Sequence, residues 1–253
     1  MKNKIVFITG ASSGIGRSCA RAFAAEGAKI LMCARRVDRL KVLAGELAKE
    51  FRVPVHHFGL DVRSQAAVEK AIAGLPEVWQ PIEVLVNNAG LSRGLAKLHE
   101  GLVSDWGEMI DANVKGLLYV SRAVIPGMVE RRSGHVINIG SIAGREVYPG
   151  GSVYCATKFA VRALSNGLRL DLNGTPIRVS EVAPGMVETE FSIVRFHGDT
   201  DRAGKVYQGL KPLSPDDIAE AVVWCGTRPP HVNVSELVVM PTAQASPTLV
   251  HRS

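Results

Sequence analysis

The sequence predicts an α/β fold, in which one doubly wound sheet of seven parallel strands carries helices on both faces within a single domain. Three observations support this prediction. Short, β-branched apolar runs alternate with helical patterns along the chain, and runs that are apolar throughout are typical of strands buried on both faces. The 253 residues, of which 46% are hydrophobic, suffice for one large core. No linker, repeat or low-complexity tract divides the chain.

Seven segments have the residue types of buried strands, and six segments between them have helical periodicity. Several of the helical segments begin with Ser or Pro, which favour the first positions of a helix. The predicted strands are residues 4–9, 29–33, 53–58, 82–87, 134–140, 177–182 and 237–240. The predicted helices are residues 14–26, 36–50, 64–75, 104–131, 152–172 and 215–225.

The longest stretch without a clear helix or strand pattern runs from residue 184 to residue 212. Loops of this length in a compact domain are usually functional lids or disordered. This stretch follows a strand end, which is where open α/β sheets bind their ligands. We therefore expect it to contribute to a ligand site.

The formal charge of +6 does not by itself indicate a nucleic-acid partner, because the Lys and Arg residues are spread along the chain. A basic surface that attracts anionic ligands explains the charge more simply. The four cysteines have no disulfide or zinc-ligand spacing. The first ten residues lack a signal-peptide core, and no later run is long enough to span a membrane. We expect a cytoplasmic protein that binds neither metal, membrane nor nucleic acid.

A glycine-rich loop follows the first predicted strand and reads T-G-A-S-S-G-I-G-R over residues 9–17. Its glycines permit a tight turn, close approach of backbone N–H groups to a pyrophosphate, and close packing of helix on strand. The spacing differs from G-x-G-x-x-G, and an ordinary strand-to-helix turn is the alternative. Its place in the α/β pattern favours a Rossmann-type dinucleotide site. The candidate cofactor residues here are Gly10, Ser12, Ser13, Gly14, Ile15 and Gly16.

The end of the second predicted strand indicates which dinucleotide binds. An NAD-specific fold normally has Asp or Glu there, which binds the ribose hydroxyls and repels a 2′-phosphate. This chain instead has Arg35 and Arg36, whose guanidinium groups suit charge-assisted binding of a phosphate. Unless both arginines are merely solvated, the cofactor is NADP.

Tyr154 and Lys158 lie four residues apart at the start of a predicted helix, so their side chains share one face. A free tyrosine has a pKa of about 10, and a nearby ammonium stabilises the phenolate and lowers that pKa. The pair therefore indicates general acid/base chemistry. By chance the same spacing also occurs in helices whose Tyr is in the core and whose Lys is solvated.

Two further polar residues are candidates for the same site. Ser141 follows a predicted strand, where its hydroxyl could bond a substrate oxygen that gains or loses charge; a turn serine is the alternative. Asn113 lies inside a predicted helix, where Asn is unfavourable, which indicates a role for its amide or backbone.

Together these motifs resemble the full set of the short-chain dehydrogenase/reductase family, over nearly the whole chain. The set comprises residues 9–16, Asn87-Asn88-Ala89-Gly90, Asn113, Ser141, Tyr154, Lys158 and Pro184-Gly185. The resemblance implies that Tyr154 is the general acid/base. Lys158 would bind the nicotinamide ribose and lower the tyrosine pKa, and Ser141 would orient the substrate. Asn113 would hold a water molecule that links Lys158 to solvent.

The resemblance also implies cofactor contacts outside the glycine-rich loop. Asp61 would meet the adenine, Thr189 the carboxamide, and residues 87–90 would support the central strand and contact the cofactor. The implied set is Asp61, Val62, Asn87, Ala89, Gly90, Pro184, Gly185, Val187 and Thr189. Assembly as a homotetramer or homodimer is common in the family, and we expect a homotetramer.

Within the family, four segments look like the NADP-dependent 3-hydroxy acid dehydrogenases, also called serine dehydrogenases: residues 106–111, 126–131, 190–199 and 233–242. That likeness implies hydride transfer to and from L-serine, L-allo-threonine, 3-hydroxyisobutyrate and the matching semialdehydes. Such substrates need a fixed cation or several donors for their carboxylate, and Arg195 and Arg145 are the candidate cations, unless they are surface or subunit-contact residues. Two alternatives stay open: a reductase of larger neutral ketones, and a non-catalytic NADP sensor.

Overall fold

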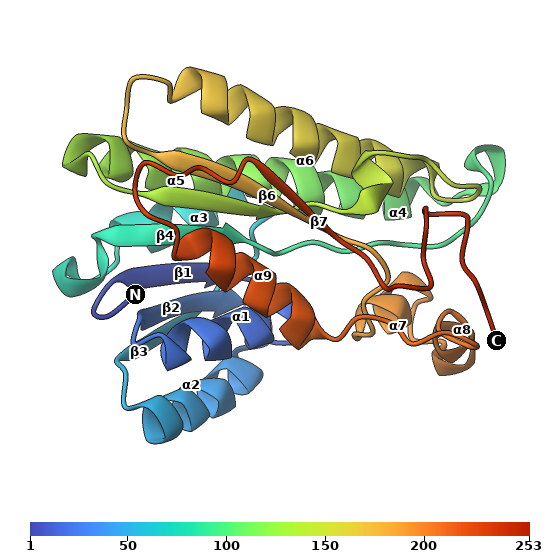
Figure 1. The fold of residues 1–253 in the computed structure, drawn as a ribbon, viewed down its shortest axis with the longest axis horizontal. Coiled ribbons are helices and arrows are strands. Elements are labelled where there is room, and N and C mark those ends of the chain that lie inside the picture. The colour runs from blue at the N-terminus through green and yellow to red at the C-terminus, as the bar shows by residue number, and fades with distance from the viewer.

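The computed structural model describes all residues from 1 to 253, and it contains the predicted sheet of seven parallel strands (Figure 1). The strands are β1 (Ile5–Thr9), β2 (Lys29–Ala34), β3 (Val55–Gly59), β4 (Ile82–Asn87), β5 (His135–Ile139), β6 (Arg178–Pro184) and β7 (Glu236–Val239). Their order is β3-β2-β1-β4-β5-β6-β7, and all pairings are parallel. The chain therefore reverses direction across the sheet between β1 and β4, which confirms the doubly wound prediction.

Helices cover both faces of the sheet (Figure 1). One layer contains α1 (Gly14–Ala25), α2 (Val37–Phe51) and α9 (Pro215–Gly226); the other contains α3 (Gln65–Ala73), α4 (Val103–Ile110), α5 (Gly116–Arg131) and α6 (Ser152–Asp171). Side chains of β1 alternate between the layers: Val6 and Ile8 belong to the core cluster under α1, α2 and α9, and Ile5 and Phe7 to the other. Burial on both faces explains why the strands are apolar throughout.

The predicted helix 104–131 is interrupted in the structure by a π-helical turn, Asp111–Lys115, between α4 and α5. The turn contains Asn113, whose amide bonds both backbone groups of Leu91: its Oδ1 accepts from the Leu91 N–H at 2.8 Å, and its Nδ2 donates to the Leu91 carbonyl at 2.8 Å. Single π-helical turns inside α-helices are frequent at functional sites. The unfavourable Asn in the helical pattern therefore marks a real departure from α-helix.

The segment after β6 contains two short helices, α7 (Phe191–Arg195) and α8 (Thr200–Lys205), so the expectation of no regular structure between residues 184 and 212 was wrong in part. Helices of five and six residues are too short to produce a readable periodicity. The C-terminal tail packs on this segment, where the Arg252 guanidinium donates to the Val206 carbonyl at 3.1 Å. Both helices lie at one end of the molecule, beside the C-terminus (Figure 1).

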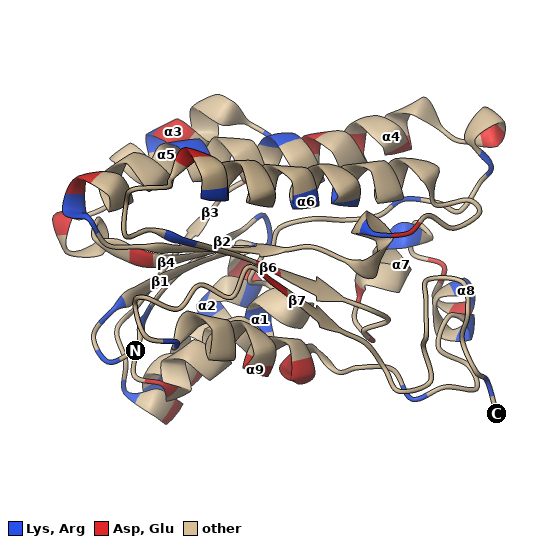
Figure 2. Cartoon of the chain, turned by 45° about the horizontal axis from the view of Figure 1, so that its top comes forward, with Lys and Arg blue, Asp and Glu red and all other residues tan.

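Lys and Arg residues are interspersed with Asp and Glu residues along the helices of both layers (Figure 2). No helix of the structure is both long and apolar enough to cross a membrane.

One charged network lies inside the fold rather than on its surface. Glu181 on β6 is fully buried, and the Arg145 guanidinium donates to its two carboxylate oxygens at 3.1 and 3.3 Å. Arg145 also donates to Glu236 on β7 at 2.8 Å. A carboxylate without solvent is costly unless a cation compensates it, so Arg145 ties the β5–α6 connection to the two last strands.

We predict that Arg145→Met lowers the free energy of unfolding by about 3–5 kcal/mol, because it leaves the buried Glu181 carboxylate without its cation. Urea denaturation followed by circular dichroism measures this. Arg17→Met is the matched control: Arg17 pairs with Glu46 at 3.0 Å on the surface, and its loss should cost at most about 1 kcal/mol. Equal effects of the two substitutions would contradict a structural role for Arg145.

Candidate active site

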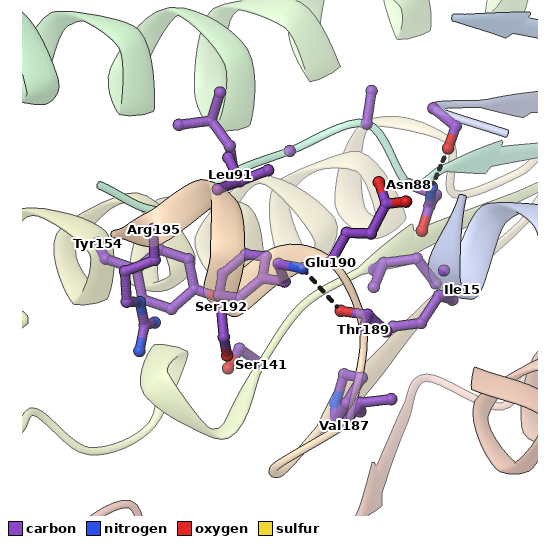
Figure 3. Close-up of a pocket in the computed structure, with 18 of the residues that line it drawn as sticks. Ile15, Asn88, Leu91, Ser141, Tyr154, Val187, Thr189, Glu190, Ser192 and Arg195 are labelled. Atoms are coloured by element: carbon purple, nitrogen blue, oxygen red, sulfur yellow. Dashed lines mark hydrogen bonds between the residues drawn. The ribbon is translucent and has the colours of Figure 1, made fainter. Parts of the chain in front are cut away.

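A cavity of about 530 Å³ opens at the carboxyl ends of the strands. The β1–α1 loop, the ends of β2, β4, β5 and β6, and the segment that contains α7 line it. Figure 3 shows Tyr154, Ser141 and Arg195 toward one end of this cavity, and Ile15 and Asn88 toward the other. The position is the one that the reversal of strand order predicts for a ligand.

Asn88 fixes the conformation of the glycine-rich loop through hydrogen bonds to its backbone. Its Nδ2 donates to the carbonyl groups of Thr9 at 2.9 Å and Gly10 at 3.2 Å. Gly10 has a φ of +67°, and a Cβ there would lie 2.9 Å from the Ala89 Cα, so no other residue fits without displacement. The free N–H groups at the start of α1 are available to an anion, as a dinucleotide pyrophosphate requires.

Arg36 lies where the glycine-rich loop meets the end of β2. Its Nε donates to the Ser12 Oγ at 3.2 Å and its Nη2 to the Ser13 Oγ at 2.7 Å. Its Nη1 donates to the Glu190 carboxylate at 2.7 Å, and Arg39 donates to the same carboxylate at 2.6 Å. Arg35 also lines the cavity. This set of hydroxyl and guanidinium donors fits the 2′-phosphate of NADP.

Tyr154 and Lys158 are both buried on α6 and both line the cavity. The Lys158 Nζ lies 5.9 Å from the centroid of the Tyr154 ring and donates to the Ile139 carbonyl at 2.9 Å. The edge of the Phe191 ring packs against Tyr154, with centroids 5.6 Å apart. The predicted Tyr154–Lys158 pair therefore faces the same cavity.

Burial shifts the pKa values of this pair in opposite directions. It raises the pKa of the Tyr154 phenol well above its usual range, and the nearby Tyr148 adds to this, while the Arg195 cation and the Ser141 hydroxyl oppose it. Burial lowers the pKa of Lys158 to about 8, against the opposing charge of Glu181. Lys158 thus keeps its positive charge at neutral pH, and cations favour the phenolate form of Tyr154.

Ser141 begins the turn Ile142–Gly144 after β5, where its Oγ accepts from the Ala143 N–H at 3.1 Å. This is the turn geometry that the alternative interpretation expects, yet the residue also lines the cavity. Asn113 lies behind the wall: besides Leu91, its Nδ2 bonds the Thr157 Oγ at 3.0 Å, and Thr157 donates to the Tyr154 carbonyl at 2.7 Å. Asn113 therefore supports the start of α6 through its hydrogen bonds.

Arg195, at the end of α7, lies beside the tyrosine. Its Cζ is 5.4 Å from the centroid of the Tyr154 ring and 5.1 Å from that of Phe191. Its Nε donates to the Ser92 Oγ at 3.1 Å and its Nη2 to the Tyr148 Oη at 3.2 Å. The guanidinium carries no carboxylate partner, so its charge is available to an anion in the cavity.

Most predicted site residues lie on the cavity wall. They are Gly10, Ser12, Ser13, Gly14, Ile15, Arg35, Arg36, Asp61, Val62, Ala89, Gly90, Ser141, Tyr154, Lys158, Pro184, Gly185, Val187, Thr189 and Arg195. Gly16, Asn87 and Asn113 lie behind it. A Cβ on Gly16 would meet the Asn88 amide at 2.4 Å, and Asn87 bonds Ser121 at 3.0 Å and Asn138 at 2.9 Å inside the fold.

The prediction that Arg145 could bind the substrate carboxylate was wrong. It does not line the cavity, and its guanidinium is occupied by the carboxylates of Glu181 and Glu236. A cation that compensates a fully buried carboxylate is not available to a substrate. Arg195 is therefore the arginine that the structure brings to the tyrosine.

The sequence reasoning missed several residues around the cavity. Asn88 belongs to the quoted Asn87–Gly90 motif, so the motif itself was the signal for it. No local pattern pointed to Ser92, Tyr148, Phe191 or Glu190, because they reach the site only through contacts between the segment that contains α7 and three distant parts of the chain: the loop after β4, the β5–α6 connection and the end of β2. The Gly94 N–H, for example, donates to the Arg195 carbonyl at 2.8 Å.

Comparisons with known proteins agree with this geometry. Residues 4–199 match the family model of short chain dehydrogenases. The chain is 51% identical to the NADP-dependent 3-hydroxy acid dehydrogenase YdfG of Salmonella typhi, over 98% of this chain and 100% of the relative. It is 46% identical to sulfoacetaldehyde reductase 2 of Chromohalobacter salexigens, over 95% of each protein.

Among solved structures, the closed form of serine dehydrogenase complexed with NADP⁺ matches with a TM-score of 0.92 and 49% identity, over 98% of this chain and 100% of that chain. The cavity, the glycine-rich loop and the arginine and serine donors fit the same cofactor. The chain belongs to the short-chain dehydrogenase family and is an NADP-dependent oxidoreductase that acts on CH–OH groups.

Proposed function

We propose that this enzyme transfers a hydride between NADP(H) and small 3-hydroxy acids, such as serine, allo-threonine and 3-hydroxyisobutyrate, or the matching semialdehydes. The observation that carries the proposal is the Arg195 guanidinium, 5.4 Å from the Tyr154 ring and without a carboxylate partner. A 3-hydroxy acid has its reacting hydroxyl two carbon atoms from its carboxylate carbon. One small molecule therefore presents both groups to this end of the cavity.

In the proposed reaction Tyr154 is the general acid/base. It takes the proton of the substrate hydroxyl during oxidation and returns a proton to the carbonyl oxygen during reduction. Bound NADP supplies or accepts the hydride at its nicotinamide ring. The Ser141 hydroxyl donates a hydrogen bond to the reacting oxygen and so stabilises the negative charge that develops there.

Lys158 has two proposed roles, which are to lower the Tyr154 pKa by its charge and to bind the nicotinamide ribose. Its pKa of about 8 keeps it cationic at neutral pH. Asn113 is proposed to hold the water that connects Lys158 to solvent. Its amide already bonds Leu91 and Thr157, so its Oδ1 and backbone carbonyl are the remaining acceptors for such a water.

For the cofactor we propose that the glycine-rich loop binds the pyrophosphate and that Arg35 and Arg36 bind the 2′-phosphate. Asp61 and Val62 would border the adenine. The Asp61 carboxylate is held by Arg63, with an Nη2–Oδ2 distance of 2.6 Å, which lowers its pKa and keeps it ionised. Thr189 would bond the carboxamide of the nicotinamide.

A second candidate function has specific support from a relative. Sulfoacetaldehyde, which gives its name to the reductase of Chromohalobacter salexigens, carries its sulfonate one carbon atom beyond the carbonyl carbon, as a 3-hydroxy acid semialdehyde carries its carboxylate. Arg195 would bind either anion. A panel of carboxylate semialdehydes, sulfoacetaldehyde and neutral ketones, assayed with NADPH, shows which of these three substrate classes the enzyme reduces with the highest kcat/KM.

Assembly as a homotetramer in the cytoplasm is part of the proposal. Leu118 on α5 and Phe159 and Leu170 on α6 are exposed apolar side chains and offer a surface for subunit contacts. All four cysteines are free and buried, in keeping with a reducing compartment.

We predict that Tyr154→Phe lowers kcat by about 10²–10⁴-fold, the range for loss of general acid/base catalysis. NADPH affinity should stay nearly unchanged, because only the transferable proton is removed and the ring still packs against Phe191. Steady-state kinetics and fluorescence titration of NADPH measure the two effects. A kcat within about tenfold of the parent would remove Tyr154 from this role.

Replacing Arg35 and Arg36 by Met should weaken NADPH binding by about 1.5–3 kcal/mol, the range for a charge-assisted hydrogen bond, and should leave NADH binding much less affected. Only NADPH carries the 2′-phosphate that these guanidinium groups would bind. KM values for the two cofactors provide the comparison. Equal losses would mean that the arginines support the fold instead of the phosphate.

Arg195→Met should lower kcat/KM for serine and 3-hydroxyisobutyrate by about 1.5–3 kcal/mol, because these substrates lose a charge-assisted bond. Neutral ketones, which have no anion, should be spared. Arg202→Met is the matched control, since Arg202 also stacks on an aromatic ring, 4.5 Å from the Phe196 centroid, but does not line the cavity. A parallel fall for acids and ketones would show that Arg195 is not the anion site.

A further inference from the structure

The Glu190 carboxylate pairs with Arg36, one of the two arginines that are proposed to bind the 2′-phosphate of NADP, and with the nearby Arg39. Its Oε2 accepts from the Arg36 Nη1 at 2.7 Å, and its Oε1 accepts from the Arg39 Nη1 at 2.6 Å. Glu190 comes directly before α7, 154 residues from Arg36 along the chain. The proposed cofactor site therefore already contains an anionic side chain of the protein itself.

The rest of the Arg36 guanidinium is fixed against the glycine-rich loop. Its Nε and Nη2 donate to the hydroxyl groups of Ser12 and Ser13, so the Nη1 side is the one that faces Glu190. The Nη1 groups of Arg36 and Arg39 thus both donate to the carboxylate of Glu190. Because carboxylates and phosphate monoesters are bound by arginine through the same paired N–H groups, the two anions compete for these groups.

The pairs that Glu190 makes are easily displaced. The side chains of Arg36, Arg39 and Glu190 are 43%, 50% and 40% exposed, and ion pairs this exposed contribute little net stability. A phosphate dianion carries more charge than a carboxylate. If Glu190 stayed in place beside the phosphate, the two like charges would repel each other.

We propose that Glu190 is a specificity-determining residue for the cofactor, because its carboxylate competes with the 2′-phosphate for Arg36 and Arg39. NADP has to displace Glu190 in order to bind these arginines, and NAD does not. Glu190 therefore reduces the preference of the enzyme for NADP over NAD below the value that the arginines alone would give. It also keeps the two cations paired while the site holds no phosphate.

The test uses fragments that report the phosphate alone. Adenosine 2′,5′-bisphosphate carries the 2′-phosphate, and adenosine 5′-monophosphate is the same molecule without it. Isothermal titration of the full-length protein with each compound gives their dissociation constants, for the parent and for Glu190→Gln. Glu188→Gln is the control, since Glu188 is an exposed acid two residues away that makes no ion pair and does not line the cavity.

We expect Glu190→Gln to bind the bisphosphate about three- to fivefold more tightly than the parent, which is in the range for the small net contribution of exposed ion pairs such as the two that Glu190 makes. The monophosphate should bind equally to both proteins, which also shows that the variant is folded. Glu188→Gln should behave as the parent. NADP⁺ and NAD⁺ titrations should repeat the pattern, with tighter binding of NADP⁺ alone.

Weaker or unchanged binding of the bisphosphate to Glu190→Gln would overturn the inference, since Glu190 would then hold the arginines in place for the phosphate or have no part in binding it. An equal gain for both compounds would overturn it as well. The inference about Glu190 rests on the proposed role of Arg36 in binding the 2′-phosphate, and different results would contradict these two claims. If the parent does not prefer the bisphosphate to the monophosphate, the role of the arginines fails first.

Discussion

The Tyr154 phenol is buried beside the Phe191 ring and close to the cations of Lys158 and Arg195, and the proposed chemistry depends on this environment. Burial favours the neutral phenol, whereas a base is needed to oxidise an alcohol. The charge of Arg195 opposes burial and favours the phenolate, and we propose the same effect for the charge of Lys158. The proposed chemistry therefore requires two cations close to one tyrosine, neither of them in an ion pair with a carboxylate.

The fold supplies this arrangement through its connections. Lys158 is one helical turn from Tyr154 and is tied to the end of β5 through the Ile139 carbonyl. Arg195 comes from a distant segment and donates to the hydroxyl groups of Ser92 and Tyr148, which accept its hydrogen bonds without neutralising its charge. Arg145, by contrast, is neutralised by Glu181. The two arginines differ in function because one has a buried carboxylate beside it and the other has hydroxyl groups.

The sequence predicted what depends on local spacing. The strand and helix segments, the glycine-rich loop and the Tyr154–Lys158 pair all lie within short stretches whose geometry follows from the period of the element. Asn113 was singled out as a poor helix residue, but the hydrogen bonds that its amide makes from the π-helical turn go to Leu91, 22 residues away. The short helices α7 and α8 were missed because five or six residues give no period to read.

Contacts between distant segments could not be predicted in this way. Arg145 was proposed as a substrate ligand because it follows Ser141, and the sequence gives no sign that Glu181, 36 residues later, lies buried beside it. Glu190 was read only as part of a family-like segment, whereas its contacts with Arg36 and Arg39 bring together β2, α2 and α7. Electrostatic pairs of this kind are decided by tertiary packing, which a single sequence taken alone does not show.

The pH dependence of substrate oxidation in Lys158→Met, compared with the parent, tests the central claim most directly. In the proposed reaction oxidation requires the Tyr154 phenolate, so kcat/KM should rise with pH through the apparent pKa of this group. Removing a cation that favours the phenolate raises that pKa. The account predicts that the rising limb of the profile moves to higher pH by about one unit or more, equivalent to about 1.4 kcal/mol. If the rising limb of the kcat/KM profile had its midpoint at the same pH in both proteins, the account would be contradicted, because the charge of Lys158 would then not act on Tyr154.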